Sequence, residues 1–162
     1  MELDLKWKPF MLDPSRSKKG VDKLQAYMKK FGPGIKEMLL DPNNMLNRRG
    51  RPMGIEFNYH EGSKVFNTFD QHRLMFYTRE KYGGEAQNKL QEIMFRKYFK
   101  EGLNLGEPEE LVAAGVEAGL EESEVQDILK NEDKLKDEVD EELVESHSSC
   151  SGVPHFNFSS GQ

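Results

Sequence analysis

The sequence is poor in cysteine, which limits its redox chemistry. Cys150 is the single cysteine among 162 residues. Because a disulfide needs two thiols, these residues can form neither an internal disulfide nor a Cys-x-x-Cys motif. No cationic neighbour is fixed beside Cys150 in its serine-rich stretch, so we interpret it as an exposed thiol without a catalytic role. The four histidines lack the spacing of metal ligands, and we expect no metal site.

The sequence also lacks a long apolar run. None approaches the roughly 20 residues that a helix needs to cross a bilayer. The opening stretch, Met1–Lys6, alternates charged and apolar side chains, which resembles neither a secretory signal nor a transit peptide. We therefore expect no membrane association and a cytoplasmic location.

Acidic and basic residues are unevenly distributed along the chain. Residues 1–100 contain 20 Lys and Arg against 12 Asp and Glu, whereas residues 101–145 contain 3 against 17. We interpret the acidic block as the solvated faces of several helices. The basic half contains no Lys/Arg run of the kind that binds nucleic acid, so we expect no nucleic-acid partner.

Apolar residues recur every three or four positions through most of the chain, which predicts a largely helical protein. One helix has a clear start, because Thr68-Phe-Asp-Gln71 matches a capping box in which the Thr68 hydroxyl accepts from the third helical N–H. Residues 41–64 are rich in Asn, Gly, Pro and Arg and are predicted as a long loop. The predicted helices cover about 20–31, 35–41, 69–82, 85–101, two stretches beginning at Pro108 and Glu121, and 132–145.

Two segments alternate with a period of two instead. Leu3–Trp7 and Val153–Phe158 each place apolar or aromatic residues at every second position, which predicts one strand at each end of the helical block. Two separate strands do not make a stable sheet. Either they pair with each other, or their sheet partners are missing.

Four short segments of the chain stand out: Trp7-Lys-Pro-Phe10, Asn67-Thr-x-x-x-His-Arg-Leu74, Tyr98-Phe-x-x-Gly102 and Ser151-Gly-Val-Pro154. In this order, they resemble segments of the FrnE-type branch of the DsbA-like thioredoxin-domain family. The resemblance implies an α/β, mostly helical fold: a thioredoxin-like, DsbA-type sheet remnant with a large inserted helical domain. Residues 1–14 and 150–162 would be sheet fragments, and residues 15–149 the inserted helical domain.

The resemblance also implies that family elements are missing at both ends. The family's first strand and its Cys-x-x-Cys helix would precede Met1, and Ser160-Gly-Gln162 resembles a family loop that arrives too early. We therefore expect a chain truncated at both ends.

The resemblance places substrate-binding residues at two positions. Val153 and Pro154 match the family's cis-proline loop, where the residue before proline pairs with a bound peptide or glutathione as in an antiparallel ladder. Asn67, His72 and Arg73 match a helix start beside the active-site cleft, and Arg73 is suited to a ligand carboxylate. No residue of this chain is predicted to be catalytic.

Three functions remain open at this stage. The family implies thiol-disulfide exchange, for which this chain lacks the second thiol and should be inactive. A glutathione-dependent isomerase or transferase, with glutathione as cosubstrate, and a non-catalytic interaction module are the alternatives. The partners expected are a thiol or disulfide protein, or glutathione, with no other cofactor. Unpaired sheet edges also predict marginal stability or a homodimer.

Overall fold

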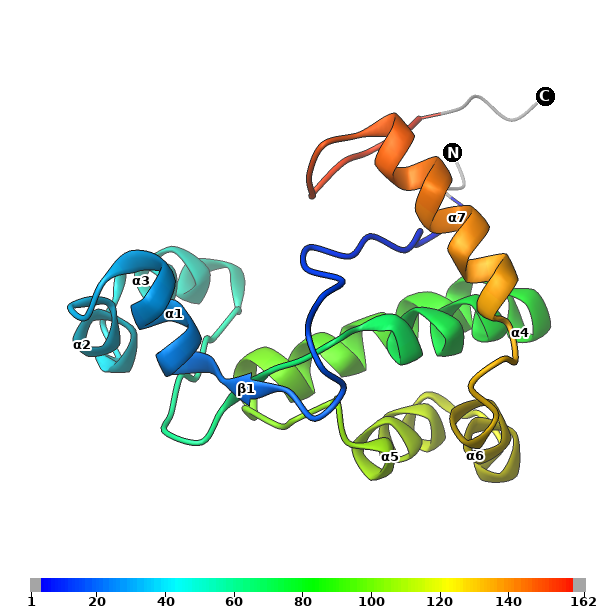
Figure 1. Ribbon diagram of the computed structural model, residues 1–162, viewed down its shortest axis with the longest axis horizontal. Helices are drawn as coiled ribbons and strands as arrows, with labels where there is room; N and C mark the ends of the chain where they lie inside the picture. Colours follow the sequence, from blue (N-terminus) through cyan, green and yellow to red (C-terminus); the bar gives the residue numbers. More distant parts are fainter. Residues whose placement is uncertain (1–3, 159–162) are drawn as a thin grey trace.

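Most of the chain is helical, as the spacing of its apolar residues predicts. The computed structural model describes residues 4–158, so Leu3 and Ser160-Gly-Gln162 lie outside the described residues. In Figure 1, α4 crosses the molecule with α5 and α6 on one side and α7 on the other. The helical elements are α1 (Lys23–Phe31), α2 (Ile35–Leu40), α3 (Met45–Gly50), the 3₁₀-helix η1 (Arg51–Met53), α4 (Phe69–Phe95), the π-helix η2 (Arg96–Lys100), α5 (Pro108–Ala118), α6 (Glu122–Lys130) and α7 (Lys136–Ser149).

Helix α4 contains the break that the sequence predicts between its two halves. Gly83 has φ 87° and ψ 175°, which are not helical angles, so the helix kinks there. At the neighbouring Gly84, an added Cβ would lie 3.1 Å from both Asp4 Oδ1 and the Leu5 carbonyl oxygen. The absence of a side chain at Gly84 therefore lets the N-terminal segment approach the backbone of α4 closely.

The main core lies where α4 packs against α5 and α6. A Cβ on Gly115 of α5 would lie 2.8 Å from Val125 Cγ2 of α6, so the two helices approach closely at a glycine. A second, smaller cluster joins Met11 of the N-terminal segment to Val139 and Leu143 of α7, and Phe69 and Phe76 of α4 pack against it. The residues of the main core are Phe66, Leu74, Met75, Leu90, Ile93, Met94, Leu105, Leu111, Ala114, Ala118, Leu120, Val125 and Ile128.

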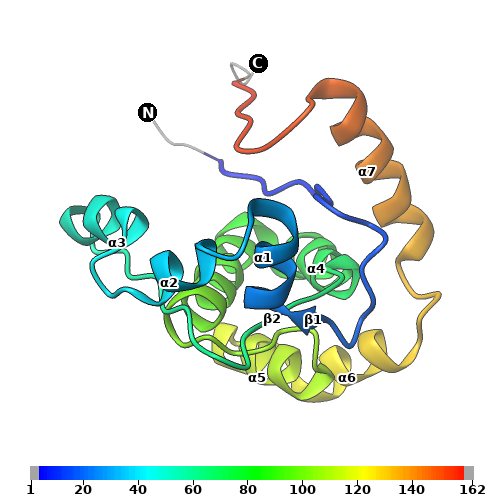
Figure 2. The same cartoon turned by 60° about the vertical axis from the view of Figure 1, so that its left-hand side comes forward.

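A short antiparallel pair connects the α1–α3 lobe to the rest of the molecule. Strand β1 (Val21–Asp22) pairs with β2 (Lys64–Val65), with Val21 opposite Val65. Figure 2 shows this pair between α1 and the α5–α6 side. The sequence predicts neither these strands nor α3, which lies in the predicted loop 41–64. Two-residue strands are too short to show a period, and α3 depends on the Asn44 side chain, which accepts from Asn47 N–H at its N-terminus.

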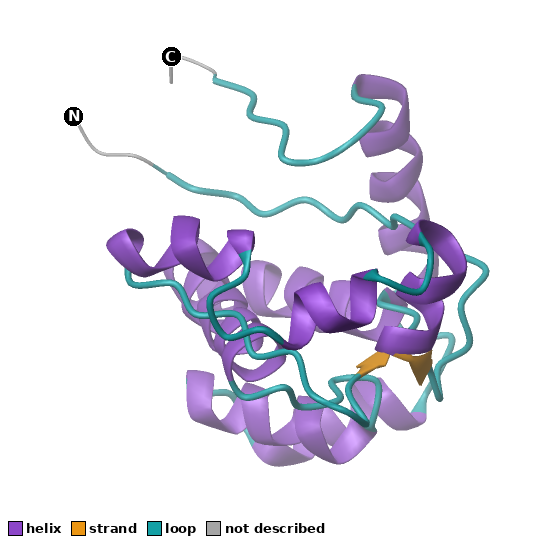
Figure 3. Ribbon diagram, turned by 90° about the vertical axis from the view of Figure 1, so that its left-hand side faces the viewer, coloured by secondary structure: helices purple, strands orange, loops and turns teal. Residues whose placement is uncertain are grey.

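The strands predicted at 3–7 and 153–158 are wrong for the part of each that the structure describes. Both segments are drawn as loops in Figure 3, and the β1–β2 pair is the sole sheet within residues 4–158. The physical reason is the absence of ladder partners, because backbone groups in an isolated strand stay paired with water. Consistent with this, Phe156 is 70% exposed and Phe158 89% exposed.

Candidate functional site

The N-terminal segment is held along α4 by one buried amide. Gln87 accepts from Trp7 N–H at 3.0 Å and donates to the Trp7 carbonyl oxygen at 3.0 Å. It therefore supplies both hydrogen bonds that a neighbouring strand would supply. The Trp7 indole donates to Asn88 Oδ1 at 2.9 Å and packs edge-on against Phe95. The predicted strand is thus replaced by an extended segment fixed by side chains.

Replacing Gln87 with leucine should release this segment. The change removes both hydrogen bonds to Trp7, but the freed backbone can reach water, so we expect a loss of only about 1 kcal/mol of folding free energy. Trp7 is the single tryptophan of the chain, so its emission should shift to longer wavelength as the indole becomes solvated. Asn88→Ala, which removes only the indole hydrogen bond, should give a smaller shift. Unchanged emission in Gln87→Leu would contradict the anchoring role.

A charge cluster closes this region from the side of α7. Glu142 is 9% exposed and pairs with Lys8 of the N-terminal segment and, at 2.9 Å, with Arg79 of α4. The two cations compensate the buried carboxylate, so the cluster ties three elements together. Beside it lies a cavity of about 30 Å³, lined by Trp7, Lys8, Pro9, His72, Met75, Phe76, Gln91 and Glu142. This volume suits a water molecule and not a substrate.

His72 faces this cavity from the first turn of α4. Burial lowers its pKa to about 4, against a weaker opposing effect from a hydrogen bond with the Phe10 backbone. Its Nε2 lies 3.3 Å from Thr68 Oγ1. At neutral pH the ring is therefore an uncharged group packed under the N-terminal segment.

Asn67, and not Thr68, supplies the hydrogen bond at the start of α4. The predicted capping box is wrong, because the Thr68 side chain makes no cap hydrogen bond and Gln71 donates to the Leu105 carbonyl oxygen instead. Asn67 Oδ1 accepts from Phe69 N–H at 2.9 Å, so the residue before the cap satisfies the free helical donor. Its Nδ2 also donates to the Pro14 carbonyl oxygen at 3.2 Å.

Arg73 is fully buried and connects α4 to the end of α6. Its side chain is 0% exposed, and Nη2 donates to Asp70 Oδ1 at 2.7 Å. Nη1 lies 2.8 to 2.9 Å from three backbone carbonyl oxygens, those of Ile128, Asn131 and Lys134. In this structure the guanidinium therefore binds the end of α6 and the turn that follows, and presents no surface to a ligand carboxylate.

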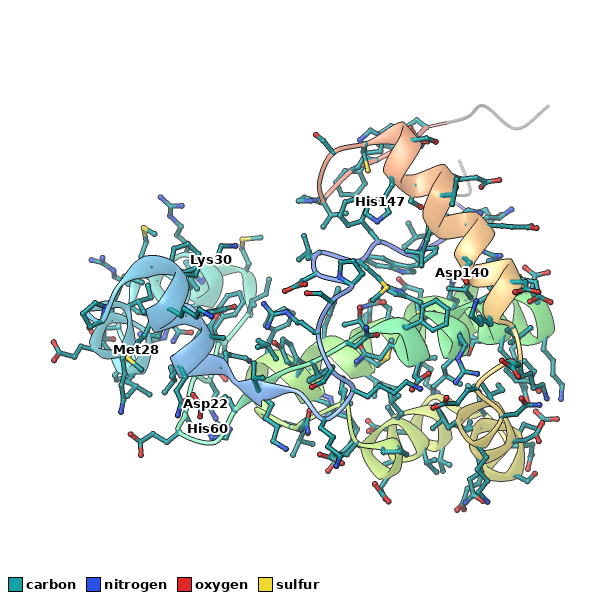
Figure 4. All side chains as sticks on the ribbon, in the orientation of Figure 1. Asp22, Met28, Lys30, His60, Asp140 and His147 are labelled. Carbon is teal, nitrogen blue, oxygen red and sulfur yellow. The ribbon has the colours of Figure 1, made fainter. Side chains whose placement is uncertain are left out.

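Val153 and Pro154 occupy the exposed loop after α7. Val153 is 49% exposed, Pro154 is also exposed, and the peptide bond between them is cis. The end of α7 contacts the N-terminal segment, because the rings of Phe10 and His147 lie 4.3 Å apart between centroids. Figure 4 shows His147 on the side of α7 that faces this segment.

The structure brings only some of the predicted site residues together. Asn67, His72 and Arg73 share the start of α4, but no hydrogen bond within residues 4–158 joins them to Val153 or Pro154. His72 has only an indirect link to the loop at Val153 and Pro154. Its ring hydrogen-bonds the backbone of Phe10, and the Phe10 ring packs against His147 near the end of α7. Cys150, half-buried at the end of α7, donates to the Ser146 carbonyl oxygen at 3.4 Å.

Sequence reasoning missed Gln87, although a signal for it exists. Gln87, Leu90 and Met94 lie at i, i+3 and i+7 on the buried side of α4. A polar residue on such an apolar stripe is expected to hydrogen-bond a neighbouring element. Glu142 carries no such signal, because it lies among many exposed acidic residues.

Across residues 4–158 no three His, Cys, Asp or Glu side chains are arranged to hold a metal ion. No helix in the same residues combines the length and apolarity required to cross a bilayer.

Comparison with known proteins identifies the fold and the protein family of this chain. The structure matches that of a probable DsbA oxidoreductase from Streptomyces coelicolor with a TM-score of 0.78 and 26% sequence identity. The match covers 91% of this chain and 62% of the other, so the chain spans less than two thirds of that protein. The family model of the DSBA-like thioredoxin domain matches residues 1–162. The chain belongs to this DsbA-like thioredoxin family. No curated protein gave a significant match.

Proposed function

We propose that the chain supplies the helical domain and the substrate-facing loop of an FrnE-type thiol-disulfide oxidoreductase. The whole-chain match to the DsbA-like family carries this proposal. The oxidoreductase family of the Streptomyces coelicolor neighbour supports the same reaction class. The short segments that resemble FrnE-type proteins narrow the class further.

The proposed binding edge is the loop at Val153 and Pro154. Its exposure leaves the Val153 backbone accessible to an extended chain, which would pair with it by backbone hydrogen bonds. His72 would support this edge through the N-terminal segment, with Asn67 and Arg73 fixing the helix that carries it. The proposed partners are proteins with thiols or disulfides in the cytoplasm, with glutathione as the alternative small partner.

The thiol count limits the reaction. Reduction of a disulfide by a dithiol transfers two electrons and leaves a new disulfide, which needs a second thiol to resolve the mixed-disulfide intermediate. Residues 1–162 contain only Cys150. A full exchange cycle thus requires a resolving cysteine that residues 1–162 do not contain, so these residues should not catalyse turnover.

A turnover assay tests this proposal. Residues 1–162 should reduce insulin no faster than the dithiothreitol background, and Cys150→Ser should behave identically. Insulin reduction that depends on Cys150 would contradict the expected inactivity. Binding of an unfolded, disulfide-containing protein should weaken in Val153→Gly/Pro154→Ala, and binding unchanged in that variant would remove the proposed edge. Glutathione binding that needs the same two residues would favour the glutathione-dependent alternative.

A further inference from the structure

A buried lysine without a carboxylate partner lies at the junction of the α1–α3 lobe with the rest of the molecule. Lys23, the first residue of α1, is 3% exposed. Its Nζ lies 3.9 Å from the ring centroid of Tyr98 and 5.4 Å from that of Tyr59. Within residues 4–158 no carboxylate lies within 4.0 Å of it. Burial lowers the pKa of Lys23 to about 8, as expected for an ammonium that no anion compensates.

Three tyrosines lie near this lysine. Tyr27 follows Lys23 by one turn of α1, Tyr59 precedes β2, and Tyr98 lies in the π-helix η2. The three groups are close enough that the charge of one raises the pKa of another. Burial is the larger cause and raises the pKa of Tyr59 to about 12, so its hydroxyl stays protonated and can donate. A π-helical segment is frequently associated with a functional site.

These four polar groups have no hydrogen-bond partner among the described residues. Every side-chain nitrogen or oxygen that is fully buried in residues 4–158 does have one. The Lys23 ammonium and the three hydroxyls therefore keep contact with solvent, although Lys23 as a whole is buried.

The local charge balance decides which ligand fits. The charge of Arg16 acts to lower the pKa of Tyr27 and Tyr98, against the larger effect of burial. Arg16 is itself paired with Asp13 at 3.1 Å. The carboxylate of Asp22 accepts from Gln25 N–H at 2.7 Å and thereby caps α1. One positive charge, that of Lys23, thus remains uncompensated, which suits an anion of one charge that accepts several hydrogen bonds.

We propose that Lys23, Tyr27, Tyr59 and Tyr98 form a binding site for a carboxylate. The ammonium would supply charge and the phenol hydroxyls would supply directed hydrogen bonds. The site lies at the α1 side of the molecule, away from the loop at Val153 and Pro154. In Figure 4 the neighbouring Asp22 lies at the far side from His147, which marks the end of α7. The proposal is therefore independent of thiol exchange.

Titration with sodium acetate, followed by NMR of the tyrosine rings, tests this site. We expect saturable shifts of the Tyr59 and Tyr98 signals that sodium chloride at equal ionic strength does not cause. Lys23→Met should weaken acetate binding about tenfold or more, because a hydrogen bond to a charged group is lost. Lys36→Met is the control, since Lys36 is paired with Glu61 outside the site.

Tyr98→Phe is the second variant, in case Lys23→Met does not fold. It keeps the ring beneath Lys23 and removes one donor, so acetate should bind several-fold more weakly. An acetylated dipeptide and its C-terminal amide separate two sources of the carboxylate. Tighter binding of the dipeptide acid than of acetate or the amide indicates a peptide end, whereas tighter binding of acetate indicates a small free acid. Shifts that are linear, equal with chloride, or unchanged in both variants would overturn the proposal.

Discussion

Replacing Arg73 with methionine should lower the free energy of unfolding by about 3–5 kcal/mol, the range found when one partner of a buried ion pair is removed. The substituted side chain would fill much of the same volume but donate nothing. The carbonyl oxygens of Ile128, Asn131 and Lys134 would lose their shared donor at the end of α6. Asp70 would keep Lys18, at 3.2 Å, as its remaining cation. For a chain of this size, thermal denaturation should show a melting temperature lower by about 10 °C.

Arg48→Met provides the matched control. Arg48 lies exposed on α3 and makes no ion pair with the described residues, so its loss should change stability by less than about 0.5 kcal/mol. Equal melting temperatures for the Arg73 and Arg48 variants would mean that the hydrogen bonds around Arg73 contribute little. That result would contradict the structural role assigned to Arg73.

The sequence and the structure suggest different roles for Arg73, ligand binding and structural support. The short His-Arg-Leu segment resembles a family motif beside a cleft, so sequence comparison alone favours contact with a ligand. The structure shows the same side chain pointing into the junction of α4 with α6. A motif can be retained because it holds the cleft's helices together, and sequence alone does not separate that role from direct binding.

Helices were predictable wherever an apolar stripe extended over several turns. The stripe at Leu24 predicts α1, and the break at Gly83 predicts the kink in α4. The last helix begins at Lys136 and not near residue 132, and ends at Ser149. Its boundaries were poorly predicted because acidic residues flank a stripe only one residue wide.

Elements that depend on distant contacts were not predictable. Helix α3 is held by Asn47, whose amide donates to the Phe57 carbonyl oxygen and whose Oδ1 accepts from Phe57 N–H. These hydrogen bonds join two segments in which apolar residues show no regular spacing. The reverse error affected the terminal segments, where a period of two was present but no neighbouring strand was. Alternation predicts which side of a strand is buried, whereas pairing decides whether a sheet forms.

The candidate site was predictable in its position on α4 and not in its detailed contacts. The family resemblance selected the start of this helix, where His72 does contact the N-terminal segment. The capping prediction failed because Asn67 and Thr68 both offer an oxygen, and only the turn before the helix decides which one reaches the free N–H. Choices of this kind depend on backbone angles that composition does not encode.

Lowering the pH should destabilise the protein through His72. The pKa of this ring is 6.5 in the unfolded chain and about 4 in the fold. Between these values the unfolded chain binds the additional proton, so stability rises with pH and falls as the pH drops. From about pH 7 to about pH 4.5, the contribution of His72 should fall by roughly 2 kcal/mol. Urea denaturation at several pH values measures it as the difference between the wild type and His72→Gln.

The comparison with His72→Gln removes the effect of carboxylates, because they titrate in both proteins. His155→Gln changes an exposed histidine of the C-terminal loop, so it should keep the wild-type pH dependence. A constant difference between wild type and His72→Gln across this range would show that the ring accepts its proton inside the fold. The N-terminal segment would then have to move away from α4 to let water reach His72. Trp7 emission, recorded in the same samples, would detect that movement, because Gln87 holds Trp7 against the same helix.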